Sequence, residues 1–157
     1  LITDKSSPSE LFASGKLLGR PSAGRMSMFF YDPKFKNRLP YYDTFPLVLP
    51  LEPMKGGFIG LNFHYLPYGA RFKFLQTLQS YASNNKFDQS TKIQASYSSI
   101  KNNKYTKVAI KRYLYSHVRS NFLRVNVNEM ALAAYLPVAQ FQGKTIGGVF
   151  AAARKNF

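Results

Sequence analysis

Strand-like segments come before helix-like segments in this 157-residue chain, and this order constrains its fold more than any other feature. Three apolar runs, residues 26–31, 45–51 and 58–63, have strand composition and are separated by turn-forming residues. Pro46 and Pro50 restrict the second run to an edge strand or a strand with frayed ends, because proline cannot donate a ladder hydrogen bond. The three runs predict an antiparallel meander.

Helical spacing follows these strands. Apolar side chains recur every three or four residues over about residues 67–83, which predicts an amphipathic helix. Shorter helices are predicted near residues 88–100 and 128–136, and a basic helix is predicted over residues 104–119. Residues 122–127 alternate apolar and polar side chains, which is typical of a half-buried strand that returns to the meander.

This separation of strands and helices predicts an α+β fold rather than a doubly wound parallel sheet. We expect a small antiparallel bent sheet or an SH3-like barrel, with helices inserted between the strands. The length suits one compact domain, which we place at residues 26–142. An extended docking arm is predicted for residues 1–25 and a basic C-terminal tail for residues 143–157. No run of about 18 apolar residues occurs, so we expect no membrane-spanning helix.

The predicted arm is rich in Ser, Gly and Pro and holds one short apolar patch. Such a segment buries too little apolar surface by itself to offset the entropy of ordering. We therefore expect it to become ordered against a neighbouring subunit or against its own domain. The candidate subunit-interface residues are those of this patch together with two tyrosines of the N-terminal half: Leu11, Phe12, Leu17, Leu18, Tyr41 and Tyr42.

Positive charge is concentrated in the last two thirds of the chain. Residues 53–157 hold 15 basic and 2 acidic side chains, whereas residues 1–52 hold 7 and 5. Most of these cations lack an acidic partner within residues 53–157. This indicates either a polyanion or an acidic protein surface as partner. The alternative is a compositional bias without an anionic partner. The candidate residues for binding nucleic acid or an acidic partner are Lys101, Lys104, Lys107, Lys111, Arg112, Arg119 and Arg124.

No convergent catalytic set is visible in the sequence. The chain has no cysteine, and its seven carboxylates are mostly far apart, unlike the clustered ligands of a two-metal nuclease. His64 and His117 are expected to be hydrogen-bonded, partly buried structural residues. We therefore predict a non-enzymatic protein with no metal site and no cofactor. The aromatic residues of the N-terminal half suit core packing better than a stacking platform for single-stranded nucleic acid.

Several segments resemble a known protein family. They are residues 26–34 (MSMFFYDPK), 39–48 (LPYYDTFPLV) and 57–67 (GFIGLNFHYLP), with a looser match at residues 111–114 (KRYL). Together they resemble small virion proteins of contractile-tailed bacteriophages, some of which are labelled DNA end protectors. This resemblance implies a protein that joins the virion and shields the packaged DNA terminus, and it supplies no catalytic residues.

Composition and resemblance together predict a non-enzymatic virion component of a tailed bacteriophage. It would bind and shield packaged double-stranded DNA or its terminus near the head–tail junction, as part of a multi-subunit assembly with other virion proteins. The alternative is a structural neck or baseplate subunit that joins neighbouring virion proteins without contacting DNA.

Overall fold

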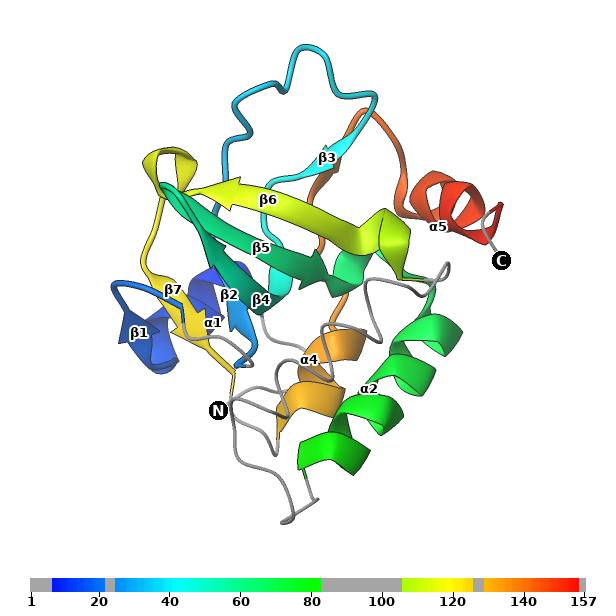
Figure 1. Ribbon diagram of the computed structural model, residues 1–157, viewed down its shortest axis with the longest axis horizontal. Helices are drawn as coiled ribbons and strands as arrows, with labels where there is room; N and C mark the ends of the chain where they lie inside the picture. Colours follow the sequence, from blue (N-terminus) through cyan, green and yellow to red (C-terminus); the bar gives the residue numbers. More distant parts are fainter. Residues whose placement is uncertain (1–6, 22–24, 83–105, 126–128, 156–157) are drawn as a thin grey trace.

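A six-stranded antiparallel sheet forms the centre of the protein (Figure 1). The computed structural model describes residues 7–21, 25–82, 106–125 and 129–155. The strand order is β1-β7-β2-β4-β5-β6, and the sheet is bent and open rather than closed into a barrel. Its strands are β1 (Leu17–Leu18), β2 (Ser27–Met28), β4 (Leu47–Met54), β5 (Gly57–Asn62), β6 (Ile110–Leu114) and β7 (Phe122–Arg124). The predicted α+β class is confirmed.

The predicted meander is present as β2, β4 and β5, and β7 returns to it by pairing with β2. β4 lies inside the sheet and not at an edge, contrary to the first expectation from its prolines. It tolerates Pro50 because the pairing of β4 with β2 ends at Val48. In addition, the register of β4 against β5 shifts between Pro50 and Glu52, as at a β-bulge.

Two of the predicted helices are present: α2 (Tyr68–Ala82) and α4 (Met130–Tyr135). They pack against each other (Figure 1). The buried Arg71 of α2 joins the two helices by donating a hydrogen bond to the carbonyl oxygen of Ala134 at 2.7 Å, and it also donates to the carbonyl oxygen of Leu66 at 2.7 Å. The helix predicted near residues 88–100 lies outside the described residues.

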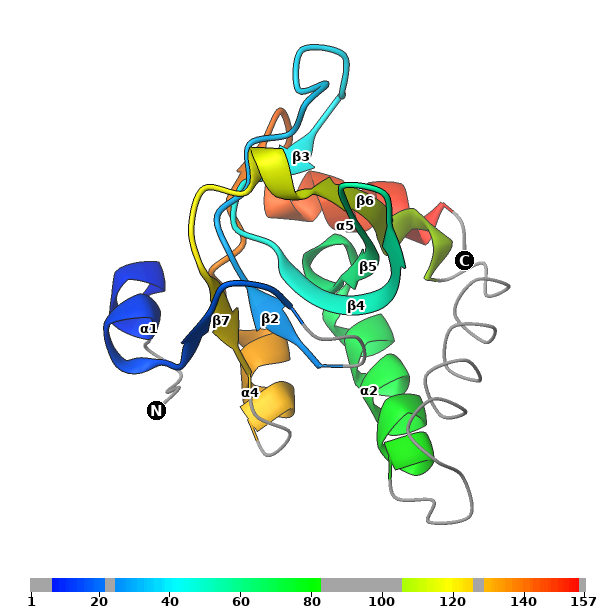
Figure 2. The ribbon, with the colours of Figure 1, turned by 60° about the vertical axis from the view of Figure 1, so that its left-hand side comes forward.

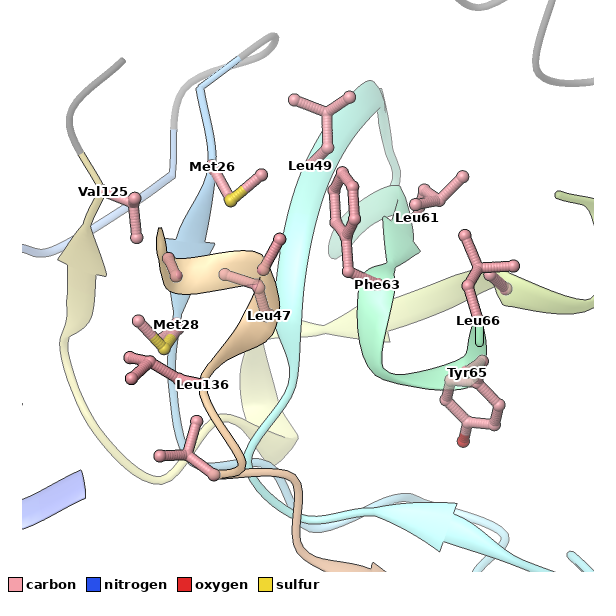
Figure 3. Close-up of a cluster of buried hydrophobic side chains, with 14 of the residues drawn as sticks. Met26, Met28, Leu47, Leu49, Leu61, Phe63, Tyr65, Leu66, Val125 and Leu136 are labelled. Atoms are coloured by element: carbon pink, nitrogen blue, oxygen red, sulfur yellow. The ribbon is translucent and has the colours of Figure 1, made fainter. Parts of the chain in front are cut away.

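The sheet has buried side chains on both faces. The larger cluster joins the sheet to α2 and α4 and includes Met28, Leu47 and Phe63 (Figure 3). A smaller aromatic cluster lies on the opposite face and includes Phe29, Phe58, Tyr113 and Phe122. Successive side chains of a strand point to opposite faces, so the unbroken apolar run of β4 is explained by burial on both sides.

The predicted extended arm is wrong for residues 8–18. Residues Pro8–Ser14 form helix α1, whose first turn is capped by the Ser7 side chain accepting from the Glu10 amide at 3.3 Å. Leu11 is only 2% exposed and belongs to the chain's own core. β1 then pairs with β7. The chain's own core therefore holds Leu11, and its own sheet pairs with residues 17–18.

The predicted basic helix over residues 104–119 is also wrong. The described part of this segment forms the short 3-10 helix η2 (Lys107–Ala109), strand β6 and the 3-10 helix η3 (Tyr115–His117). All five residues of β6 pair with β5. β-Branched and aromatic residues recur through this segment and suit a strand once a neighbouring strand is available. The presence of that neighbouring strand cannot be inferred from helical spacing within the segment.

The predicted C-terminal tail is a folded helix over most of its length. Residues Ile146–Arg154 form α5, which Thr145 caps by accepting from the Gly148 amide at 3.1 Å. Val149, Phe150 and Ala153 are buried against the rest of the protein. This segment is therefore part of the domain, because its apolar side chains repeat on one helix face.

Candidate nucleic-acid interface

A loop formed by residues 33–40 projects beyond the sheet, at the top of Figures 1 and 2. We call it the tip loop. Its backbone is turned back on itself by three hydrogen bonds: Lys36 N to Pro33 O at 3.3 Å, Arg38 N to Phe35 O at 2.8 Å and Leu39 N to Phe35 O at 3.1 Å. Residues 34–40 are all exposed. The loop is thus an ordered turn that presents its side chains to solvent.

The side chains at this loop combine an aromatic ring with cations. Phe35 is 55% exposed, the largest fraction among the exposed hydrophobic residues of the described chain. Lys34 Nζ lies 5.3 Å and Arg38 Cζ 5.8 Å from the centroid of its ring. Aromatic rings stack on nucleic-acid bases while neighbouring cations contact phosphates, so this combination is typical of nucleic-acid binding.

Further cations surround the base of the tip loop. Asp32 accepts a hydrogen bond from Lys36 Nζ at 2.9 Å and lies 3.5 Å from the guanidinium of Arg119. The hydrogen bond from Lys36 and the charges around it lower the pKa of Asp32. Lys144 lies over the ring of Tyr41, 4.6 Å from its centroid. We call the five basic residues the cationic tip: Lys34, Lys36, Arg38, Arg119 and Lys144.

A two-stranded ribbon supports the tip loop. It consists of β3 (Tyr42–Asp43) and β8 (Phe141–Gln142), which are antiparallel. Next to it, Gly143 has a φ of +91°, and a Cβ at this position would collide with the carbonyl oxygen of Pro40. Glycine at this position therefore allows the segment after β8 to approach the base of the loop.

The buried carboxylate of Asp43 connects this ribbon to the sheet. Its Oδ1 accepts from the amides of Phe45 and Gln140, both at 3.0 Å. Its Oδ2 accepts from Asn62 Nδ2 at 3.0 Å and lies 2.7 Å from His64 Nδ1. Burial by itself would raise the pKa of Asp43, but its interactions with His64, Asn62 and the Phe45 amide together lower it. Three chain segments, residues 43–45, 62–64 and the segment at Gln140, thus meet at one charged group.

The Asp43–His64 pair has the atoms of an acid–base pair but is closed to a substrate. Both residues are buried, and Nε2 of His64 is buried without a hydrogen-bond partner. His117 is half-buried, and its Nδ1 lies 2.9 Å from the carbonyl oxygen of Asp32. Both histidines are therefore hydrogen-bonded within the fold, as predicted. Across the described part of the chain, no three His, Asp or Glu side chains are grouped so as to hold a metal ion.

The predicted basic residues do not form one face. Lys111 and Arg112 are consecutive on β6 and so point to opposite faces of the sheet. Lys111 is half-buried, with its Nζ 4.2 Å from the centroid of the Tyr65 ring, and burial lowers its pKa. Arg112 is exposed, and Arg124 is half-buried on β7.

Of the other predicted cations, Arg119 belongs to the cationic tip. Lys107 is exposed on η2, at the other end of β6 from the η3 turn that precedes Arg119. Lys101 and Lys104 lie outside the described residues. The structure thus replaces the expected basic helix by separate basic positions. It also brings forward Lys34, Lys36 and Arg38, which the sequence placed only within the stacking platform that was judged less suited than core packing.

The predicted interface residues have varied surroundings. Leu11 is buried in the chain's own core, and Phe12 packs on Phe30 and Phe45 with ring centroids 5.5 and 6.0 Å apart. Leu17 is exposed on β1, and Leu18 is half-buried. Leu11 thus offers no side-chain surface to a partner, whereas the role of the other residues as subunit contacts stays a prediction.

Aromatic residues at the base of the tip loop mostly pack within the protein. Tyr41 and Tyr42 are half-buried, and Tyr41 contacts the rings of Tyr65 and Phe141. The expectation that the N-terminal aromatic set serves packing is confirmed, since Phe29, Tyr31, Phe45, Phe63 and Tyr65 are buried. The sequence reading missed Phe35, although its position between two lysines was a signal for an exposed ring.

Fold and surface together define an α+β protein with an aromatic, cationic loop suited to an anionic partner. A family model described as Phage T4 terminal DNA protecting protein matches residues 12–155. The chain therefore belongs to this family of phage DNA-end protecting proteins, and the resemblance seen in the sequence is confirmed. No curated protein and no solved structure matches the chain. No helix within the described residues is long and apolar enough to cross a membrane.

Proposed function

We propose that this protein binds the terminus of packaged phage DNA in the virion, near the head–tail junction, and shields it by occupying it. Membership of a family of terminal DNA protecting proteins supports this role. The net charge of +15 favours association with a polyanion. The observation that carries the proposal furthest is the cationic tip, whose five basic side chains lie on and at the base of a projecting loop, where two of them pair with the partly exposed carboxylate of Asp32.

The shielding acts through binding rather than catalysis. A bound protein excludes a nuclease from a DNA end in proportion to its occupancy of that end, so no turnover is required. Cations that contact phosphates provide affinity for any sequence, which suits a protein that recognises a terminus. The buried Asp43 network fastens the ribbon beneath the tip loop to the sheet, which favours a loop backbone that is ordered before DNA binds.

End protection is tested with a linear duplex exposed to an exonuclease that degrades from ends. We expect protection to rise with the ratio of protein to ends and to reach a plateau near a fixed stoichiometry. The control is the same duplex as a covalently closed circle, treated with an endonuclease, where end binding gives no protection. Equal protection of both substrates would contradict an end-specific role.

A structural subunit of the neck or baseplate that does not contact DNA is the second candidate. It is favoured by a separate exposed apolar surface on α2 and α4 formed by Tyr68, Leu132 and Tyr135. Such side chains are typical of contacts with other proteins. An image of the virion with this chain located distinguishes the two candidates, because a position away from the DNA path supports the structural role.

A further inference from the structure

The ring of Phe35 is exposed at the end of a loop whose backbone holds it there. The carbonyl of Phe35 accepts hydrogen bonds from the amides of Arg38 and Leu39, so residues 35–39 form a closed turn. The ring does not fold back onto the core, and within the described residues the flanking cations Lys34 and Arg38 lie over it. An apolar ring held in water between two cations indicates a partner with both a flat apolar face and negative charge.

A DNA terminus has this combination. Base pairs inside a duplex cover one another's faces and present only their edges in the grooves. The last base pair leaves one face uncovered, and phosphates border it on both strands. An aromatic side chain stacks on any base, because every base has a π-face. The ring therefore matches a feature that ends have and that continuous duplex lacks.

We propose that Phe35 caps the DNA terminus by stacking on its last base pair, while Lys34 and Arg38 contact the adjacent phosphates. This inference rests on the proposed function and adds the residues that distinguish an end from continuous DNA. Lys36 has a lesser part, because its ammonium group is hydrogen-bonded to Asp32 at 2.9 Å. Phe35 supplies the preference for ends, and the two neighbouring cations supply affinity for any duplex.

The first test compares binding to one duplex in linear and in covalently closed circular form. Phe35→Leu keeps an apolar side chain but removes the ring, so binding to the linear form should weaken roughly 5- to 150-fold while binding to the circle is unchanged. Phe35→Trp should restore the preference for ends. The matched control is Phe72→Leu, because Phe72 is a similarly exposed phenylalanine, 53%, on α2. Thermal unfolding should be the same in all three variants, since both positions are exposed.

The second test separates stacking from charge. Replacing Lys34 and Arg38 together by Ala should lower the slope of log affinity against log salt by about 1.8, and equally for both DNA forms. Replacing the exposed Lys55 and Lys155 removes the same charge elsewhere and should change this slope less. A 2-aminopurine base at the terminus should be quenched on binding by the wild type but not by Phe35→Leu, and an internal 2-aminopurine should respond to neither.

The results distinguish failure of this inference from failure of the proposed function. If the wild type prefers the linear form and Phe35→Leu retains that preference in full, Phe35 does not cap the end, while end protection stands. If the wild type binds linear and circular DNA equally, or binds only an acidic protein, the end-binding function fails and the capping role fails with it.

Discussion

Oδ2 of Asp43 and Nδ1 of His64 lie 2.7 Å apart with both side chains at most 1% exposed. The two residues come from β3 and from the 3-10 helix η1 (Phe63–Tyr65), so their contact fastens the ribbon beneath the tip loop to the end of β5. Asn62 completes the junction: its Nδ2 donates to Asp43, and its Oδ1 accepts from the amides of His64 and Leu47 at 3.0 and 3.2 Å. A buried polar network of this kind holds a surface loop in place from below.

Asp43→Ala should strongly destabilise the protein. It leaves the buried donors of Asn62, His64, Phe45 and Gln140 without their acceptor, so we expect a loss of about 3–5 kcal/mol in the free energy of unfolding. Urea unfolding followed by circular dichroism measures this loss. Asp32→Ala is the control, because Asp32 is a partly exposed carboxylate with cationic partners and should matter much less. Equal effects of the two substitutions would show that the buried network is not important.

The lowered pKa of Asp43 predicts an acid-sensitive fold. Its pKa in the folded protein is below the ordinary value of about 3.9, so the unfolded chain binds more protons and stability rises with pH in this range. The contribution of Asp43 is therefore fully present above about pH 5 and is lost as pH falls through the lowered pKa. Urea unfolding measured at several pH values below about pH 5 should show the free energy of unfolding falling as the pH is lowered. The slope of this free energy against pH should be smaller in Asp43→Asn. If Asp43→Asn has the wild-type slope, the acid sensitivity does not come from Asp43.

Leu11→Ala should destabilise the whole domain although Leu11 lies near the N-terminus of the sequence. Truncating a leucine in a packed core costs about 2–5 kcal/mol, and Leu11 is packed in the main core cluster. Leu17→Ala provides the comparison, because Leu17 is 40% exposed on β1 and should have a small effect. Thermal unfolding of both variants checks this. An unchanged melting temperature in Leu11→Ala would restore the interpretation of this segment as a separate arm.

Gly143→Ala should disturb the base of the tip loop. The backbone at this position has a positive φ, and an added Cβ would strike the carbonyl oxygen of Pro40. We expect destabilisation of more than about 1 kcal/mol and faster proteolytic cleavage within residues 33–40. Gly19→Ala is the matched control, since no atom lies within 4 Å of a Cβ built there. Equal cleavage rates in the two variants would argue against this close approach.

Arg119 and Lys111 should respond differently if the cationic tip meets phosphates. Arg119→Ala removes a cation of the tip, so the salt slope of DNA binding should fall by up to about 0.9, less to the extent that Asp32 already neutralises it at 3.5 Å. Lys111→Ala should leave the slope unchanged, because Lys111 is half-buried over Tyr65. Electrophoretic mobility shifts at several salt concentrations measure both slopes. A larger change for Lys111 would place the DNA on β6 instead.

Several elements were predictable because their signals are local. Helix α2 follows from apolar spacing and a proline before its first turn, and β2, β4 and β5 follow from short apolar runs between turn residues. β6 was not predictable, since residues 104–119 fit a helix face and a strand about equally well until β5 is beside them. The N-terminal segment was missed for a similar reason: its apolar patch is too small to fold alone, yet Leu11 packs in the main core and residues 17–18 pair with β7.

The sequence by itself determined the excess of positive charge, the local signals of β2, β4, β5 and α2, and a family resemblance that the family match confirms, because composition, periodicity and motif are properties of the chain alone. Only the tertiary structure decided which cations lie close together. The bridge between Tyr31 and Val118 brings Arg119 to the base of the tip loop, and the pairing of β3 with β8 places Lys144 over Tyr41. These contacts join residues about 80 to 100 positions apart, and long-range pairing of this kind depends on burial shared by the whole sheet.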